Sequence, residues 1–151
     1  MKSKIRYIEN KSSGHHGSAW IGWVEFSKSG QTVYFNNKAL KKLKIPGISG
    51  NHFDIETGEE YWVSGVKKNG QDRHQLGGGK IMIDRKSVPE YLKLVDFTVL
   101  DENTYTLIDF AKTDKQRFNE IENEEIFFKD TSRHSSYYDN NQRKLILNRD
   151  Y

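Results

Sequence analysis

Residues 51–70, NHFDIETGEEYWVSGVKKNG, constrain the fold of this chain more than any other stretch. They contain two short runs of β-forming residues, at 53–55 and 60–66, and each run is followed by a turn with glycine. Apolar and polar residues alternate in both runs, as expected for strands that bury one face. The alternation places the carboxylates of Asp54 and Glu56 on the solvent side. We therefore predict a β-hairpin that organises the fold and positions the loop after it.

The same alternation predicts further strands. In residues 20–26, WIGWVEF, it sets Trp23 and Glu25 together on one face. Gly22, in the middle of this run, indicates a bulge or the close approach of another backbone. The residues 97–110 are predicted as a hairpin with its turn at 101–104. The full set of other predicted strands is 5–8, 31–35, 81–83, 97–100, 105–110, 126–128 and 145–147.

Three short helices are predicted from spacing and from capping residues. Residues 38–44, KALKKLK, place their apolar side chains on one side at helical spacing, which favours one or two helical turns. Ser87 with Glu90, and Thr113 with Gln116, have the spacing of capping boxes, in which each polar pair satisfies the first backbone N–H groups of a helix.

The composition favours a fold rich in strands. Only 34% of the residues are hydrophobic, but 13% are aromatic, so the core must be built largely from rings with β-branched neighbours. Short strands, dense turns and brief helices favour a β-rich α+β protein, with a small SH3-like or OB-like antiparallel barrel. We predict that residues 1–95 form this barrel and that residues 96–151 form a C-terminal α+β extension packed on it.

Several classes of protein are excluded or disfavoured. The chain has no cysteine, which excludes disulfides, thiolate catalysis and thiolate metal sites. It has no apolar run of about 18 residues that would span a membrane, and its first residues lack the apolar stretch of a signal peptide. We therefore expect no membrane association and a cytoplasmic location.

Charge is distributed unevenly along the chain. Residues 1–50 contain nine Lys and Arg against two acids, a net charge of +7, whereas residues 101–151 contain eight against eleven, a net charge of −3. The basic first third either meets an anionic partner or packs beside the acidic last third. The sequence leaves both alternatives open.

Three segments carry a resemblance to a known family: RYIENKSSG at 6–14, IGWVEFSKSGQTVYF at 21–35 and FDIETGEEYWVSGVKKNGQDR at 53–73. They resemble small single-domain bacterial proteins with no established activity. Some members carry the name deoxyxylulose-phosphate synthase, but that enzyme is several times longer and needs a thiamine-diphosphate fold. Trp20 and Trp23 stand where members more often have a small and a basic residue. The resemblance implies that any shared function is carried before residue 85.

The basic third is also rich in aromatic residues. A small barrel with exposed rings and a basic rim stacks bases and neutralises phosphates. We therefore predict a non-catalytic binding module, with an anionic partner such as nucleic acid as the leading candidate. Most rings must lie in the core, but Trp23 shares a face with Glu25, so a lid covers it or it belongs to a binding surface. The predicted ligand-binding residues are Arg6, Lys11, Trp23, Lys28, Arg73 and His74.

A small metal-independent hydrolase or ribonuclease, toxin-like in size, is the alternative. Its catalytic residues would be His52, Arg73 and His74, because an Arg fork binds phosphate and histidine transfers protons near neutral pH. The plainer interpretation is that Asp72 caps a turn and that Arg73 pairs with a glutamate at 59–60. The sequence favours binding over catalysis, and the loop at 71–79 is the first place to look for function.

The remaining candidates are weaker. His15 and His16 have no third ligand nearby, so we expect an exposed loop there and predict no metal. Glycines at 77–79 lack the Lys-Ser/Thr of a phosphate loop, and we expect no cofactor. A third hypothesis is an immunity-type protein that binds another protein through its acidic C-terminal third.

Overall fold

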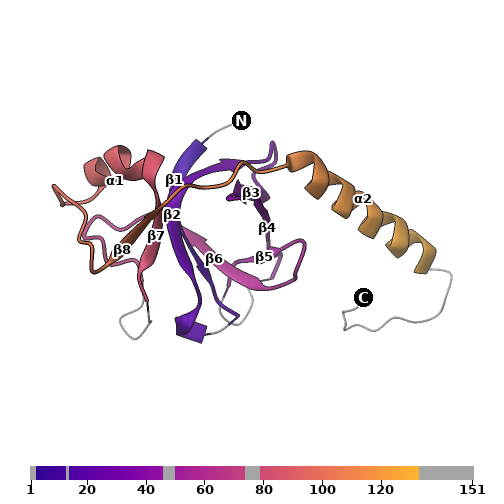
Figure 1. Ribbon diagram of the computed structural model, residues 1–151. Coiled ribbons are helices and arrows are strands. Elements are labelled where there is room, and N and C mark those ends of the chain that lie inside the picture. The colour runs from indigo at the N-terminus through magenta and orange to yellow at the C-terminus, as the bar shows by residue number, and fades with distance from the viewer. Residues whose placement is uncertain (1–2, 13, 46–49, 74–78, 133–151) are drawn as a thin grey trace. The chain divides into compact units, whose positions relative to one another are not determined.

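The computed structural model describes residues 3–12, 14–45, 50–73 and 79–132 (Figure 1). The chain divides into two compact units, Met1–Lys115 and Gln116–Tyr151. The first unit contains all the described strands. The second contains helix α2, Lys115–Ser132, apart from its first residue. No helix of the described ranges is long and apolar enough to cross a membrane.

Six antiparallel strands close into a barrel. Their order is β1-β6-β5-β4-β3-β2, and a further pairing of β1 with β2 completes the ring. This confirms the predicted β-rich α+β barrel, while its assignment as SH3-like or OB-like stays a prediction. The strands are β1 (Ser3–Asn10), β2 (Ala19–Phe26), β3 (Thr32–Phe35), β4 (Lys38–Lys42), β5 (His52–Asp54) and β6 (Glu60–Ser64).

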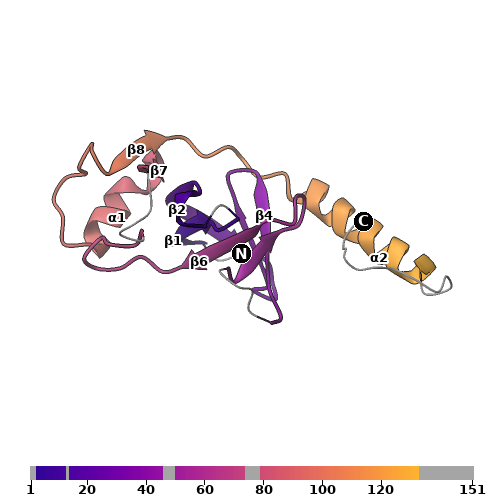
Figure 2. The same ribbon diagram turned by 90° about the horizontal axis from the view of Figure 1, so that it is seen from below.

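Two parallel strands extend the sheet beyond β2. Strand β7 (Ile81–Asp84) pairs in parallel with β2, and β8 (Tyr105–Ile108) pairs in parallel with β7. Helix α1 (Val88–Leu94) lies in the connection between β7 and β8, because parallel neighbours need a long crossover. Figures 1 and 2 show β7, β8 and α1 on one side of β1 and β2, with the rest of the barrel on the other. We call β7, β8 and α1 the outer layer.

Strand β2 is shared between the barrel and the outer layer. Its C-terminal end pairs with β3 and its N-terminal half pairs with β7 along the same edge. Gly22 lies between these two pairings, and a Cβ there would come within 2.4 Å of the Phe110 ring. Gly22 therefore makes room for the Phe110 ring. The predicted bulge or close approach of another backbone is not the reason for this glycine.

The barrel and the outer layer have separate apolar cores. Side chains alternate between them, so Ile8 and Trp20 face into the barrel while Tyr7 and Ile21 face α1. This explains why β2 begins with four consecutive buried residues. The inner core consists of Ile8, Trp20, Val24, Val33, Phe35, Leu40, Tyr61 and Val63. The outer core consists of Ile5, Tyr7, Ala19, Ile21, Ile81, Ile83, Tyr91, Val95 and Tyr105.

The prediction of a helix at residues 38–44 is wrong. Lys38–Lys42 forms strand β4 and pairs antiparallel with β3. Asn36 and Asn37 have positive φ angles of 46° and 58°, the conformation of a tight hairpin turn. This turn reverses the chain directly into a strand, and its local geometry decides against the helical spacing of the apolar side chains.

The hairpin predicted at 97–110 is also wrong. Residues 97–100 form no strand, and Tyr105–Ile108 pairs with β7 instead. Asp101 starts a turn in which its carbonyl accepts the N–H groups of Thr104 and Tyr105, both at 3.0 Å. Residues 126–128, predicted as a strand, lie in α2, and residues 145–147 lie outside the described part of the chain. The first compact unit runs beyond the predicted division at residue 95.

The two helices predicted from capping residues are present. Helix α1 follows Ser87, but the Ser87 hydroxyl donates to the Asp84 carbonyl at 2.7 Å and makes no capping bond to the helix. The helix is confirmed, while the capping box is not the reason for it. Proline at the start of α1 has the fixed φ that the first helical turn requires.

The segment after β8 is held against the barrel by the turn between β3 and β4. Asn36 Oδ1 accepts the Ala111 N–H at 2.8 Å, and Asn37 Oδ1 accepts the Asp114 N–H at 3.0 Å. Lys115 Nζ lies 2.7 Å from the Glu25 carboxylate. The two asparagines therefore serve both as turn residues and as acceptors for this segment.

Candidate functional site

Trp23 lies on the outer face of β2 and is 38% exposed, so no segment of the described ranges covers it completely. The parallel register sets Ile21 opposite Ile83. This pairing ends there, and the short helix η2 (Arg85–Ser87), which follows β7, packs against β2. The strand that carries the exposed indole is therefore in contact with a short helix that contains Arg85 and Lys86.

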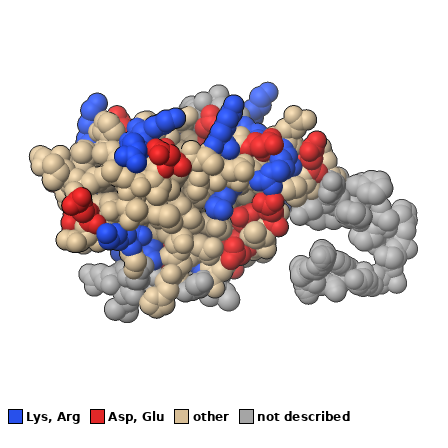
Figure 3. All heavy atoms as spheres, in the orientation of Figure 1, with Lys and Arg blue, Asp and Glu red and all other residues tan. Residues whose placement is uncertain are grey.

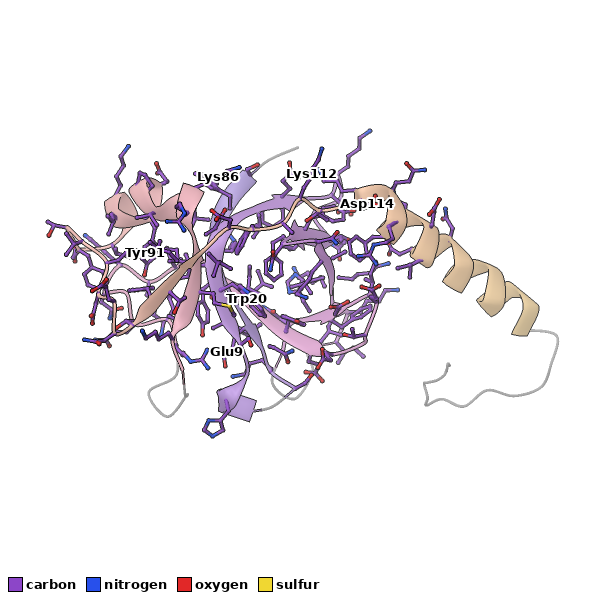
Figure 4. All side chains as sticks on the ribbon, viewed as in Figure 1. Glu9, Trp20, Lys86, Tyr91, Lys112 and Asp114 are labelled. Atoms are coloured by element: carbon purple, nitrogen blue, oxygen red, sulfur yellow. The ribbon has the colours of Figure 1, made fainter. Side chains whose placement is uncertain are left out.

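Other basic side chains share this end of the strands. Lys4 lies opposite Val24, so its side chain is on the other face of the sheet from Trp23, and Lys28 lies in the turn that follows β2. Lys86 and Lys112 extend from the upper edge in Figure 4 and make no ion pair with another described residue. Figure 3 shows basic side chains along this edge with acidic ones between them. We call Trp23, Arg85, Lys86 and Lys112 the Trp23 surface.

Some acids near this surface are already paired. Asp109 lies 3.3 Å from Arg85, and Glu25 is paired with Lys115. These ion pairs cancel the negative charges of Asp109 and Glu25. Lys86 and Lys112 therefore leave this surface with an excess of positive charge.

Two predicted ligand residues have structural partners. The Arg6 guanidinium lies over the Phe26 ring, 5.6 Å from its centroid. Lys11 Nζ lies 3.1 Å from the Glu9 carboxylate, and the side chain of Lys11 is only 12% exposed. Lys11 therefore neutralises a buried acid beside the barrel.

Arg73, in the loop after β6, interacts with Gly17, which precedes β2, and with Tyr7 on β1. Its Nη2 donates to the Gly17 carbonyl at 2.6 Å. It also lies close enough to Tyr7 to act on the pKa of that hydroxyl. Tyr7 donates to Glu9 at 2.5 Å, and burial together with Glu9 raises the pKa of Tyr7. This buried polar chain fixes the position of Arg73.

Asp72 caps a turn, as predicted. Its Oδ1 accepts the Lys67 N–H at 2.7 Å, and burial raises the pKa of Asp72. Its Oδ2 is buried and has no hydrogen-bond partner among the described residues. Tyr91 and Tyr105 are hydrogen-bonded to each other at 2.7 Å, and burial raises the pKa of both, with Asp72 contributing.

The proposed catalytic residues are not brought together by the described contacts. His52 is buried on β5, where its Nδ1 lies 2.9 Å from Asn51 Oδ1. Burial, with Lys42 nearby, lowers the pKa of His52 to about 4, so it is neutral at pH 7. Arg73 contacts Gly17 instead, and His74 lies outside the described residues.

The acidic turn after β5 differs from its prediction at one residue. Asp54 is 4% exposed, whereas Glu56 and Glu59 are exposed. Asp54 Oδ1 accepts the N–H groups of Glu56 and Thr57, at 2.8 and 3.3 Å. Burial raises the pKa of Asp54 even so. The prediction that Asp54 lies on the solvent side is wrong, because its carboxylate is needed to cap the turn.

A pocket of about 560 Å³ lies between the loop after β6 and the loop before β8. Its size falls within the usual range for small-molecule sites, about 300–1,000 Å³. Among the described residues, Arg73 is the one predicted site residue that lines it, and Gln71 begins the loop that was predicted as the first place to look for function. No pattern in the sequence indicated the remaining lining residues, because they come from segments far apart in the chain. The lining consists of Asn69, Gly70, Gln71, Arg73, Ile81, Phe97, Val99, Asp101, Thr104 and Tyr105.

Among the residues whose structure is described, no group of three His, Cys, Asp or Glu side chains is arranged to hold a metal ion. No family model, no curated protein and no solved structure matches this chain. The resemblance to small bacterial proteins therefore stays a prediction.

Proposed function

We propose that this protein is a non-catalytic binding module that holds an anionic partner, with single-stranded nucleic acid as the leading candidate, on the Trp23 surface. One observation carries the proposal. Trp23 is exposed on the strand against which η2 packs, and Lys86 in η2 and Lys112 after β8 have no acidic partner among the described residues. An aromatic ring stacks on any base, while lysines neutralise the neighbouring phosphates.

The architecture supports the same proposal. Small closed barrels of the OB-like and SH3-like kind present one face or rim to extended ligands. The proposal also assigns the protein to the bacterial cytoplasm, which agrees with a chain free of cysteine.

The experiment is fluorescence anisotropy with short labelled strands of DNA and RNA, titrated with the full chain at several salt concentrations. Binding should weaken steeply as salt rises, because counterions are released when phosphates are neutralised. Trp23→Ala should reduce affinity about tenfold, as expected for the loss of one stacked base. Lys86→Glu with Lys112→Glu should reduce both the affinity and the salt dependence.

Trp62 offers a matched control. It is 41% exposed on β6 and lies across from Glu9 on β1. Trp62→Ala should therefore leave binding unchanged. Absence of binding to any strand at low salt, or equal losses for the two tryptophan variants, would contradict the proposal.

A further inference from the structure

Strand β8 forms the open edge of the sheet. The six barrel strands close into a ring, β7 lies between β2 and β8, and β8 pairs with β7 alone among the described strands. A strand with one unpaired side presents a row of backbone N–H and C=O groups to which another strand can add. The described part of the sheet therefore ends in a template for further pairing.

The register identifies the backbone groups on this open side. Ile81 donates its N–H to the Thr104 carbonyl at 2.9 Å, so every second residue of β8, counted from Thr104, directs its backbone groups toward β7. Tyr105 and Leu107 alternate with these residues and direct theirs to the open side. The Tyr105 N–H donates to the Asp101 carbonyl at 3.0 Å. Leu107 thus has a backbone donor and a backbone acceptor that no described strand pairs.

The edge carries little that would block another strand. Natural proteins often protect an edge strand with charged side chains, with proline or with a bulge. Strand β8, Tyr105–Ile108, contains no charged residue and no proline. Leu107 is apolar and yet 46% exposed. An added strand would pair the backbone of Leu107 and also cover part of its side chain.

The charges on the two sides of β8 are complementary to a second copy of the chain. Glu102 before the strand and Lys112 after it are exposed, and neither makes an ion pair with another described residue. Each lies five residues from Leu107. Asp109, which follows β8 directly, is already paired with Arg85.

These charges favour one direction of pairing. Antiparallel pairing sets the start of each strand beside the end of the other. The turn with Glu102 in one copy would then lie near the segment with Lys112 in the second copy, and the reverse. Parallel pairing would instead set like charges side by side, which is unfavourable.

We propose that two copies of this protein associate by antiparallel pairing of their β8 strands around a two-fold axis at Leu107. The two Leu107 residues exchange both backbone hydrogen bonds, and their side chains face each other across the axis. The same surface of both copies makes the contact, so it closes as a dimer. Strand β8 is only four residues long, so the contact is small and the dimer forms at high concentration.

The dimer does not depend on nucleic-acid binding. Of the Trp23 surface, only Lys112 takes part in it. The two proposals therefore fail separately, because dimerisation is measured without nucleic acid.

The test is sedimentation velocity of the full chain from about 5 μM to about 1 mM, a range that covers weak association. The mass should rise from that of one chain toward that of two. Hydrogen exchange at both ends of the range locates the contact. The Leu107 amide should exchange about fivefold more slowly at the high concentration, whereas the amides of β3 to β5 should keep their rates.

Leu107→Lys tests the centre of the contact. It should weaken dimerisation at least about tenfold, because two like charges meet at the axis. Ile45→Lys is the matched control. Ile45 is 82% exposed, follows β4 and gains the same charge, but three strands separate β4 from β8 in the sheet order. The control should dimerise like the wild type.

A charge exchange tests the antiparallel direction. Glu102→Lys and Lys112→Glu each set like charges together at both ends of the contact, so each should weaken dimerisation about fivefold at low salt. The double variant exchanges the two charges and should restore it. A chain that stays monomeric over the whole range would overturn the proposal and leave the edge for a strand of another protein. A dimer whose Leu107 amide is unprotected, or a double variant as weak as the single ones, would also overturn it.

Discussion

The closed barrel and the outer layer share strand β2, but they are assembled by different kinds of pairing. In the barrel, all the pairs are antiparallel, and several neighbours are joined by tight turns such as Asn36–Asn37. In the outer layer the strands are parallel, and the chain leaves the sheet for α1 and a long loop before it returns as β8. The barrel is thus closed by pairs among its own strands, including the pairing of β1 with β6 from a distant part of the chain, whereas the outer layer depends on β2.

The comparison also shows that the polar groups and the mainly apolar core lie in different regions of the molecule. The pocket, Arg73 and the tyrosine pair are associated with the outer layer and its loops, while the inner core contains mostly apolar side chains. We therefore expect the outer layer to open locally with a smaller free energy than the barrel, as loop-bearing regions often do.

Leu40→Ala should have the largest effect on stability. Leu40 is fully buried in the inner core, and truncating such a side chain removes apolar burial and leaves a cavity. We expect a loss of about 3–4 kcal/mol of unfolding free energy, measured by urea denaturation with tryptophan fluorescence. Leu94→Ala in α1 is the control, because Leu94 is 43% exposed and should cost less than about 1 kcal/mol. Similar losses for both would show that the barrel interior is not the main source of stability.

Much of the barrel could be predicted because its signals are local. Alternation and glycine turns identified β1, β2, β3 and β6 to within a few residues, and the face shared with Glu25 showed that Trp23 points outward. The error at β4 has a local cause as well. A short apolar run fits both a helix and a strand, and here the left-handed backbone of two asparagines decided between them.

The outer layer and the pocket could not be predicted in the same way. Parallel pairing of β7 with β2 and β8 joins segments distant in sequence, and no turn signal marks it. Arg73 stood out as a polar residue in a loop, but nothing connected it with Asp101 or Phe97 before the strands were placed. Likewise, η2 with Arg85 comes against β2 only because β7 pairs with β2.

Acid should weaken the barrel through His52. Burial lowers the pKa of His52 from 6.5 to about 4, so between these values the unfolded chain binds a proton that the folded chain does not. The contribution to stability is complete above pH about 6.5, falls as pH drops, and levels off below pH about 4. The change is on the order of 2–3 kcal/mol. It is measured as the difference between the wild type and His52→Gln across urea denaturations at each pH. An unchanged acid-side slope in the variant would assign the effect to other groups.

Gly22→Ala tests the junction of the barrel with the outer layer. The new methyl group would overlap the Phe110 ring, which packs edge-on against Phe35 in the inner core. We expect a loss of about 2 kcal/mol, the usual cost of an overpacked site.

A double-mutant cycle with Phe110→Ala shows whether that ring is the cause. With the ring absent, the alanine at position 22 should cost less than about 0.5 kcal/mol, because residues in contact are not additive. Additive costs would point to the Asp84 side chain, the other close neighbour of Gly22.

Tyr91→Phe should have the smallest effect and should be confined to the outer layer. It removes a hydroxyl that is hydrogen-bonded to Tyr105 in a fully buried site. The loss should be about 1 kcal/mol, because one buried hydroxyl is left without its partner. The double variant with Tyr105→Phe should cost no more than the single one, since both polar groups are then gone.

Hydrogen exchange shows which region of the molecule loses stability in the Tyr91→Phe variant. If the outer layer opens independently of the barrel, Tyr91→Phe should accelerate exchange in α1 and β8 and leave the amides of β3 to β5 at wild-type rates. Leu40→Ala, in contrast, should accelerate exchange in all of them, because the outer layer depends on a strand of the barrel. Uniform acceleration by Tyr91→Phe would instead mean that the two regions unfold as one cooperative unit. The barrel and the outer layer would then differ in the polar groups that they carry, but not in stability.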